Sequence, residues 1–146
     1  MKGDLFMGAL AQKEVIGIKD LRTNLSNIID KAIADFDVFT SGNVKKGSSN
    51  TVTIMSTDMY EELLNAYCFK PIIKYDEETK QWEVYINEIG VYSCADSKGK
   101  AINEAVELAI DSTNEFIENK EIYLRMEKFK KLFPYYIRIE KCGNIS

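Results

Sequence analysis

The amino-acid sequence predicts an α+β protein composed of two small domains. Runs of β-branched and aromatic residues alternate along the chain with apolar stripes at helical spacing. Near the middle, Pro71 follows a helical pattern and a change to extended residues, which indicates a domain boundary. The 146 residues are 45% hydrophobic and 29% charged, as is typical of a globular chain. We expect one domain over residues 1–68 and a second over residues 69–146.

The first predicted helix spans Asp20 to Phe36, where apolar residues recur every three or four positions. These residues are Leu21, Leu25, Ile28, Ile29, Ala32, Ile33 and Phe36. Asp20 is expected to cap the amino end of the helix. A short strand that contains Val15, Ile16 and Ile18 is expected to precede it.

A β-hairpin and a second helix complete the first predicted domain. Residues 37–41 and 51–55 have strand character and flank a loop rich in glycine, serine and lysine, so we expect them to pair. After the hairpin, Ser56, Thr57 and Asp58 are possible caps for a helix. The apolar stripe of that helix consists of Met59, Tyr60, Leu63, Leu64 and Tyr67.

The second domain is expected to follow the order β-β-β-α-α-β. Residues 72–75 and 82–86 alternate in character around an acidic turn, and residues 91–94 form a third strand. A long amphipathic helix runs from Ile102 to Ile117. A second helix follows it and is expected to stop at Pro134. The alternation of residues 135–139 then predicts a closing strand.

Composition restricts the chemistry that this chain can perform. The sequence has no histidine, which removes the commonest general base and the commonest zinc ligand. Cys68, Cys94 and Cys142 form no C-x-x-C pair and are expected to be reduced thiols in the cytoplasm. No window of the sequence matches a membrane helix. We therefore expect a cytoplasmic protein that is not an enzyme and that holds no metal or cofactor.

The first predicted helix carries Arg22, Asn24, Leu25 and Ser26 as an Arg-x-Asn-Leu-Ser motif. With the order of strand, helix, hairpin and helix around it, this motif resembles the Phd/YefM family of bacterial antitoxins. The resemblance implies a dimer that binds operator DNA to repress its own operon and that neutralises a cognate toxin by direct binding. The chain departs from the family after the second strand, where Ser41 stands in place of the usual arginine and the hairpin loop is longer.

Three features of the second half carry a separate resemblance: an acidic turn before Trp82, the run from Glu88 to Gly90, and the run from Ile102 to Ala105. They are similar to the HicB antitoxin family, which implies a partial ribonuclease H-like or double-stranded-RNA-binding-like domain. A chain that joins the two halves resembles fused prevent-host-death proteins. The customary capping threonine of the HicB helix is missing, so Ser97 is expected to cap a longer helix.

Six residues of the first half are candidates for DNA binding. They are Lys13, Lys19, Arg22, Asn24, Lys45 and Lys46. The first three lie near the amino end of the first helix, where cations and backbone N–H groups act together on phosphate. The role of the missing family arginine is either vacant or has passed to the loop lysines. The asparagine either reads a base edge or has a structural role. The net charge of −4 gives no bulk attraction to nucleic acid, so a two-fold dimer that doubles these cations, or a higher even oligomer, is expected. A plain solvated helix face is the alternative.

The long helix of the second half carries five carboxylates that we expect to bind the toxin. They are Glu104, Glu107, Asp111, Glu115 and Glu118. Such a face repels RNA and suits a basic protein partner, while a plain solvated face is the alternative. The Phd resemblance implies a disordered carboxyl tail as the toxin-binding element, and here a patterned domain stands in its place.

The sequence also allows two functions other than that of an antitoxin. A metal-dependent nuclease needs converging carboxylates, and the candidates Asp76, Glu83, Glu88 and Asp96 are expected in a turn, on solvent-facing positions and in a loop. A DNA-binding regulator or protein-interaction module without a toxin partner is the second alternative. The many aromatic residues of the second half form either a ligand-stacking surface or the core of the domain. Most of them fall on the apolar side of their predicted helix or strand, which favours the core.

Overall fold

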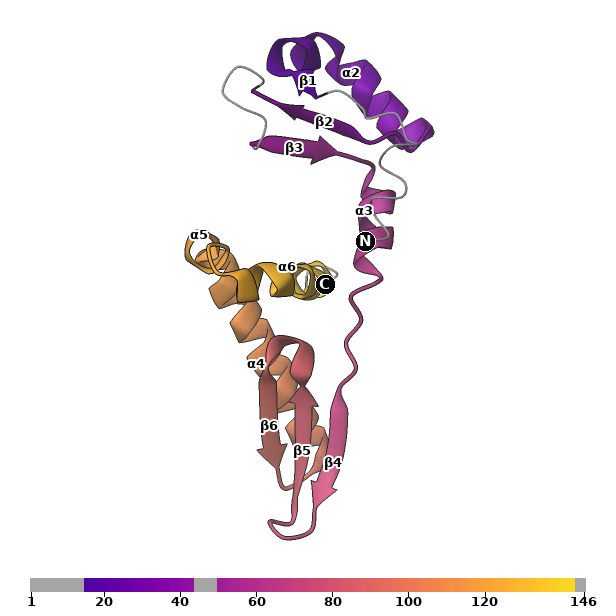
Figure 1. The fold of residues 1–146 in the computed structure, drawn as a ribbon. Coiled ribbons are helices and arrows are strands. Elements are labelled where there is room, and N and C mark those ends of the chain that lie inside the picture. The colour runs from indigo at the N-terminus through magenta and orange to yellow at the C-terminus, as the bar shows by residue number, and fades with distance from the viewer. Residues whose placement is uncertain (1–14, 44–49, 144–146) are drawn as a thin grey trace, which may run out of the picture. The chain divides into compact units, whose positions relative to one another are not determined.

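The fold is given by a computed structural model, which describes residues 15–43 and 50–143 (Figure 1). The chain divides into two compact units, Met1–Leu63 and Leu64–Ser146. Each unit contains a three-stranded sheet with helices, so the protein has the mixed α+β character that the sequence predicts. The boundary between the units precedes the one expected after residue 68. The candidates Lys13, Lys45 and Lys46 lie outside the described residues.

The first unit is built on a small sheet. Its elements are β1 (Ile16–Gly17), α2 (Ile18–Ala34), β2 (Phe39–Gly42), β3 (Thr51–Ile54) and α3 (Thr57–Leu64). Strand β2 is central, parallel to β1 and antiparallel to β3, which confirms the predicted hairpin. Ser41 is 1% exposed and donates its hydroxyl to the carbonyl oxygen of Ile16 at 2.8 Å, which ties β1 to β2. Ser56 caps α3 by accepting a hydrogen bond from the backbone N–H of Met59 at 3.2 Å.

Helix α2 begins earlier than the sequence predicts. Its N-cap is Gly17, in an extended conformation, which makes no side-chain capping hydrogen bond. Asp20 lies in the first turn, where its charge favours the helix dipole, so its expected capping role is wrong. Ile18, expected in the strand, is the first residue of α2. Periodicity placed this boundary poorly because a β-branched residue between a strand and a helix fits either element.

The second unit packs helices against an antiparallel sheet. Its elements are β4 (Ile72–Asp76), β5 (Gln81–Ile86), the 3-10 helix η2 (Asn87–Ile89), β6 (Val91–Ala95), α4 (Lys98–Glu118), α5 (Lys120–Tyr123) and α6 (Glu127–Gly143). The strand order is β4-β5-β6, and α4 packs against β5 and β6 (Figure 1). Ser97 caps α4 by accepting a hydrogen bond from the backbone N–H of Lys100 at 3.3 Å, which confirms the expected longer helix.

The core of the second unit contains one face of α4, the adjoining sheet residues and α6. Ala101, Ala105 and Ala109 are buried and allow α4 to approach the sheet closely. Phe116 is 2% exposed, and its ring stacks on that of Tyr136 with the ring centroids 4.4 Å apart. Most of the aromatic residues of this half lie in or against the core, which confirms the prediction that they form the core of the domain.

The predicted closing strand is wrong, because residues 127–143 form one helix, α6. Pro134 lies inside α6 and does not end a helix. A proline removes one backbone donor, which leaves one carbonyl of the preceding turn without its helical partner. The helix still forms because Leu132, Tyr136 and Ile139, at spacings of four and three, pack on the core. The unit therefore ends in helices and departs from the β-β-β-α-α-β order of the HicB resemblance.

Within residues 15–43 and 50–143, no helix has the length and apolarity that crossing a membrane requires. Cys68, Cys94 and Cys142 are exposed and form no disulfide with one another.

Candidate functional site

The amino end of α2 carries two of the predicted DNA-binding cations. Lys19 and Arg22 are exposed and lie three residues apart, so they are neighbours on the helix surface. Because the N-cap residue is Gly17, it has no side chain to accept hydrogen bonds from the backbone N–H groups of the first turn. A helix end of this kind with two adjacent cations is suited to a phosphate. Asp20, in the same turn, reduces the positive potential.

Asn24 is engaged within its own helix. Its side-chain amide donates to the carbonyl oxygen of Asp20 at 3.0 Å, and the hydroxyl of Thr23 donates to the carbonyl oxygen of Lys19 at 3.1 Å. Both are exposed bonds to the preceding turn. The structure thus gives Asn24 a local structural contact, and a base contact requires this side chain to turn away from α2.

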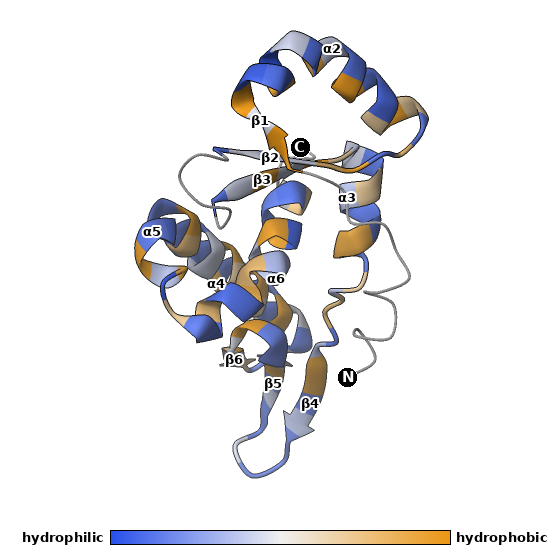
Figure 2. Ribbon diagram, turned by 45° about the horizontal axis from the view of Figure 1, so that its top comes forward, coloured by the Kyte–Doolittle hydropathy of each residue, from blue (hydrophilic) through white to orange (hydrophobic). Residues whose placement is uncertain are grey.

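Helix α2 exposes more large apolar side chains than it buries. Its two buried residues are Ile28 and Ala32. The exposed fractions of four others are 45% for Leu25, 43% for Ile29, 63% for Ile33 and 53% for Phe36, just beyond the helix. Figure 2 shows hydrophobic and hydrophilic segments alternating along α2. The four residues, spaced by four, four and three, form one stripe that we call the exposed α2 stripe.

The predicted toxin-binding carboxylates lie on the exposed part of α4. All five, Glu104, Glu107, Asp111, Glu115 and Glu118, are exposed, at spacings of three and four. The buried residues of the same helix lie on its other side. We call these five side chains the acidic α4 face. Glu115 also accepts a hydrogen bond from the hydroxyl of Tyr123 at 2.8 Å, and this bond raises the pKa of Tyr123.

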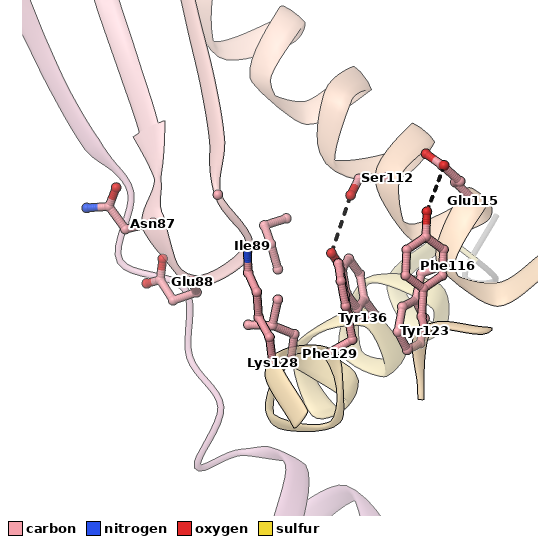
Figure 3. A pocket seen from close by; sticks show the side chains of 12 residues that line it. Asn87, Glu88, Ile89, Ser112, Glu115, Phe116, Tyr123, Lys128, Phe129 and Tyr136 are labelled. Atoms are coloured by element: carbon pink, nitrogen blue, oxygen red, sulfur yellow. Dashed lines mark hydrogen bonds between the residues drawn. The ribbon is translucent and has the colours of Figure 1, made fainter. Parts of the chain in front are cut away.

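A cavity of about 480 Å³ lies in the second unit among η2, α4, α5 and α6 (Figure 3). Its apolar lining includes Ile89, Phe116, Tyr123, Phe129, Leu132 and Tyr136. Its polar lining includes Glu88, Ser112, Glu115 and Lys128. An aromatic cavity with a few converging polar groups is the usual form of a ligand site. We call it the η2–α4–α6 cavity.

The four carboxylates considered for metal chemistry have separate roles. Asp76 accepts hydrogen bonds from the backbone N–H of Glu78 and the hydroxyl of Thr79, both at 3.0 Å, and these bonds lower the pKa of Asp76. Asp96 forms an exposed ion pair with Lys100 at 3.3 Å. Among the described residues, no group of three or more His, Cys, Asp or Glu side chains is arranged to hold a metal ion.

Glu83 is less exposed to solvent than the sequence predicts, since the alternation of its strand places it on a solvent-facing position. Its side chain is 16% exposed, and it accepts hydrogen bonds from the hydroxyls of Tyr85 at 3.2 Å and Tyr92 at 3.3 Å. Interaction with Cys94, partial burial and the nearby Glu83 carboxylate together raise the pKa of Tyr92 to about 12. Val84, the next residue in the strand, is buried, so Glu83 lies on the opposite face of the sheet. On that face Glu83 holds the hydroxyls of Tyr85 and Tyr92.

The sequence did not reveal the residues that converge on the cavity. Ser112, Tyr123 and Lys128 belong to α4, α5 and α6, and no fixed spacing links them to Glu88 in η2. Only the packing of α6 against η2 and α4 brings these groups together. The sequence predicted a helix that stops at Pro134 and a closing strand in place of α6, so it could not predict a cavity that α6 helps to line. The one available signal was the Glu88 carboxylate beside the apolar Ile89 at the end of a strand.

Comparisons with known proteins place the chain among antitoxins. A family model named PHD_like, described as an antitoxin of toxin–antitoxin, RelE/RelB, TA system, matches residues 12–146. Among curated proteins, none gives a significant match. A similar solved structure is the crystal structure of an antitoxin part of a proposed toxin/antitoxin system from Syntrophomonas wolfei subsp. wolfei. Its TM-score is 0.67 at 13% sequence identity, with 87% of each chain covered, so the similarity concerns the fold.

Proposed function

The chain belongs to the PHD-like family of antitoxins of toxin–antitoxin systems, and from this premise we propose how it acts. We propose that it binds a cognate toxin directly through its second unit and binds operator DNA as a dimer through its first unit, without performing catalysis, in the cytoplasm. The observation that carries the proposal is the family match, which spans residues 12–146 and thus both units. The HicB likeness of the second half stays a prediction.

Toxin binding is assigned to the acidic α4 face. Five exposed carboxylates on one side of a helix attract a basic surface and speed its association. The opposite side of α4 is anchored by alanines and Phe116 in the core, so the acidic face is held on a rigid element. A folded unit of this kind loses less conformational entropy on binding than a disordered tail does.

DNA binding is assigned to the amino end of α2. Each chain offers only Lys19 and Arg22 among the described α2 cations at that end, and the whole chain carries a net charge of −4. One copy therefore has little affinity for a polyanion, whereas two copies related by a two-fold axis present two such ends to two half-sites.

The exposed α2 stripe supplies a surface for that dimer. Leu25, Ile29, Ile33 and Phe36 are each between 43% and 63% exposed in a single chain. Burial of such half-exposed side chains against a second copy stabilises the complex by roughly 1 kcal/mol per side chain. In addition, Phe36 has a φ of 55°, a left-handed conformation that favours glycine. An aromatic residue in this conformation, with its ring exposed, fits a role in contacting another chain.

A band-shift measurement on the promoter of the chain's own operon tests the DNA assignment. We expect the double variant Lys19→Ala, Arg22→Ala to lose affinity and to reduce the salt slope of binding by about 0.9 for each phosphate contact removed. The matched control is Lys31→Ala, an exposed cation in the last turn of the same helix. Equal binding by the double variant and by wild type would remove α2 from the interface.

Charge reversal on α4 tests the toxin assignment. We expect Glu107→Lys with Asp111→Lys to weaken binding to the purified cognate toxin by at least about tenfold at low salt. The control, Glu77→Lys with Glu78→Lys, changes the net charge equally in the exposed β4–β5 turn. If both double variants bind the toxin as wild type does, the acidic α4 face is not the toxin surface.

A further inference from the structure

A second hollow of the second unit has a mainly apolar lining. It has a volume of about 350 Å³ and shares only Ile89 with the η2–α4–α6 cavity. The segments that line it are the residues before β4, the end of β5, η2, the middle of α4 and the carboxyl half of α6 (Figure 1). Its apolar side chains include Phe69, Ile86, Val106, Ile110 and Ile139. We call it the α4–α6 groove.

The apolar side chains of the α4–α6 groove are accessible to a ligand. Val106 and Ile110 are 48% and 45% exposed, and they lie four residues apart, so they are neighbours on the surface of α4. Phe69, Ile86 and Ile139 are half-buried and keep part of their surface open to solvent. Burial of this surface favours binding, so the groove suits an apolar ligand.

Arg138 adds one positive charge to the lining of the groove. Its Nη1 group donates to the carbonyl oxygen of Leu64 at 3.0 Å and to the side-chain oxygen of Asn65 at 3.1 Å, and both acceptors are neutral. Among the described residues, no carboxylate lies within 4.0 Å of this guanidinium, and its Nε and Nη2 donors have no hydrogen-bond partner. A half-buried guanidinium without a counter-ion favours an anion, and its planar fork suits a carboxylate.

The volume of the groove limits the ligand to a small molecule. A water molecule takes about 30 Å³ of liquid water, so a volume of about 350 Å³ accommodates roughly a dozen groups of that size. A straight-chain carboxylate of roughly eight to ten carbon atoms has this size. Its apolar chain and its single negative charge match the apolar lining and the single guanidinium.

We propose that the α4–α6 groove is a binding site for a small apolar monocarboxylate of the medium-chain fatty acid class. The hydrocarbon chain lies against Val106 and Ile110, and the carboxylate accepts hydrogen bonds from the Nε and Nη2 donors of Arg138. The Nη1 group keeps its contacts with Leu64 and Asn65, which hold the guanidinium in place before the ligand binds. The site does not depend on the proposed antitoxin function, because no residue of the acidic α4 face lines the groove.

Titration of the full-length protein with octanoate, and with octan-1-ol as its neutral counterpart, separates the contribution of the carboxylate from that of the chain. Amide NMR shifts of Val106, Ile110 and Ile139 report binding. We expect saturable shifts with octanoate and at least about tenfold weaker binding of octan-1-ol. Shorter acids are expected to bind about twofold to fourfold more weakly for each CH₂ group removed. Absence of octanoate binding overturns the proposal, and so does equal binding of acid and alcohol, which would indicate an apolar docking surface for a protein.

Two variants of α4 test where octanoate lies. Ile110→Asp places a carboxylate in the groove and is expected to weaken octanoate binding by at least about tenfold, because it repels the ligand and removes an apolar contact. Leu108→Asp is the matched control, since Leu108 is also 45% exposed on α4 but lies outside the lining of the groove. This control is expected to bind octanoate as wild type does. Equal effects of the two variants would contradict the assigned site.

Arg138→Gln tests the role of the guanidinium. Because Nη1 also binds Leu64 and Asn65, the binding of both ligands to this variant is measured. We expect octanoate binding to fall to the level of octan-1-ol binding, and octan-1-ol binding to stay unchanged. Unchanged octanoate binding contradicts the pairing with Arg138. An equal loss of both ligands contradicts it as well, because that result gives Arg138 a structural role only.

Alkylation of the native cysteines measures the position of the ligand without any substitution. Cys142 lines the α4–α6 groove, whereas Cys94 does not, and both are exposed. Iodoacetamide treatment followed by mass spectrometry gives the rate of modification at each thiol. We expect saturating octanoate to slow the modification of Cys142 severalfold and to leave that of Cys94 unchanged. If octanoate binds but does not change the rate at Cys142, the ligand lies elsewhere and the proposed site is overturned.

Discussion

Helices α2 and α4 have the same kind of sequence pattern but different surroundings. Both carry apolar residues at spacings of three and four over long stretches. Helix α4 buries Ala101, Ala105, Ala109, Thr113 and Phe116 within its own unit. Helix α2 buries only Ile28 and Ala32 and leaves the exposed α2 stripe uncovered.

Periodicity therefore identifies a helix with an apolar face but does not say what covers that face. In α4, small residues at the centre of the buried side allow close contact with a sheet of the same chain. In α2, the large side chains of Ile29, Ile33 and Phe36 stay between 43% and 63% exposed.

The first prediction concerns Phe116 and Phe36. Phe116→Ala is expected to lower the free energy of unfolding of the second unit by about 3–5 kcal/mol, because it leaves a cavity in a packed core. Phe36→Ala, at a ring that is 53% exposed, is expected to cost less than about 1 kcal/mol in dilute protein. Urea denaturation followed by circular dichroism measures both. Comparable losses for the two variants would abolish the contrast between the helices.

The second prediction concerns α6, which stays helical although Pro134 lies inside it, because its apolar residues pack on the core. Pro134→Ala restores a backbone donor inside α6 and is expected to raise the free energy of unfolding by about 1–3 kcal/mol. Helical circular dichroism is expected to stay the same or increase. A loss of stability with increased strand signal would instead favour the closing strand that the sequence predicted.

The third prediction uses the left-handed conformation of Phe36. Phe36→Gly is expected to stabilise a single chain by about 1 kcal/mol, because glycine adopts the φ of 55° without strain. The same variant is expected to weaken dimerisation, because the stripe loses an aromatic ring. Denaturation at low concentration and sedimentation at high concentration measure the two effects, whose opposite signs distinguish an interface residue from an ordinary surface residue.

The smallest expected effect is the pH dependence associated with Asp76. Hydrogen bonds from the backbone of Glu78 and the hydroxyl of Thr79 lower the pKa of Asp76 below its ordinary value of 3.8. Its stabilising contribution is therefore present above that value and is lost as the pH falls through the lowered pKa. Asp76→Asn is expected to flatten the acid side of the stability profile slightly, with Glu77→Gln as the neighbouring control. An identical acid profile for wild type and Asp76→Asn would contradict this assignment.

Local patterns predicted much of the fold. The hairpin around the glycine-rich loop, the Ser56 and Ser97 caps and the three strands of the second unit depend on neighbouring residues and are confirmed. The closing strand was wrong because positions 135 and 139 satisfy both alternation and a spacing of four, and only packing against the core decides between them.

The candidate sites were predictable only in part. Lys19 and Arg22 lie together on α2, and the acidic α4 face lies on α4, so helical spacing alone relates the residues within each group. The sequence therefore predicts correctly that both groups lie on exposed helix surfaces. The cavity depends on contacts among η2, α4, α5 and α6, which no spacing encodes. The exposed α2 stripe was visible as a pattern, but its lack of cover required the three-dimensional structure.

Sedimentation equilibrium of wild type and of Ile29→Asp tests most directly whether the α2 stripe joins two chains. We expect wild type to have twice the 16.7 kDa mass of one chain, and we expect Ile29→Asp, folded by circular dichroism, to have the mass of one chain and no longer to shift the promoter fragment. A wild-type protein that stays a single chain at high concentration, or an Ile29→Asp protein that still forms the dimer, would contradict this expectation.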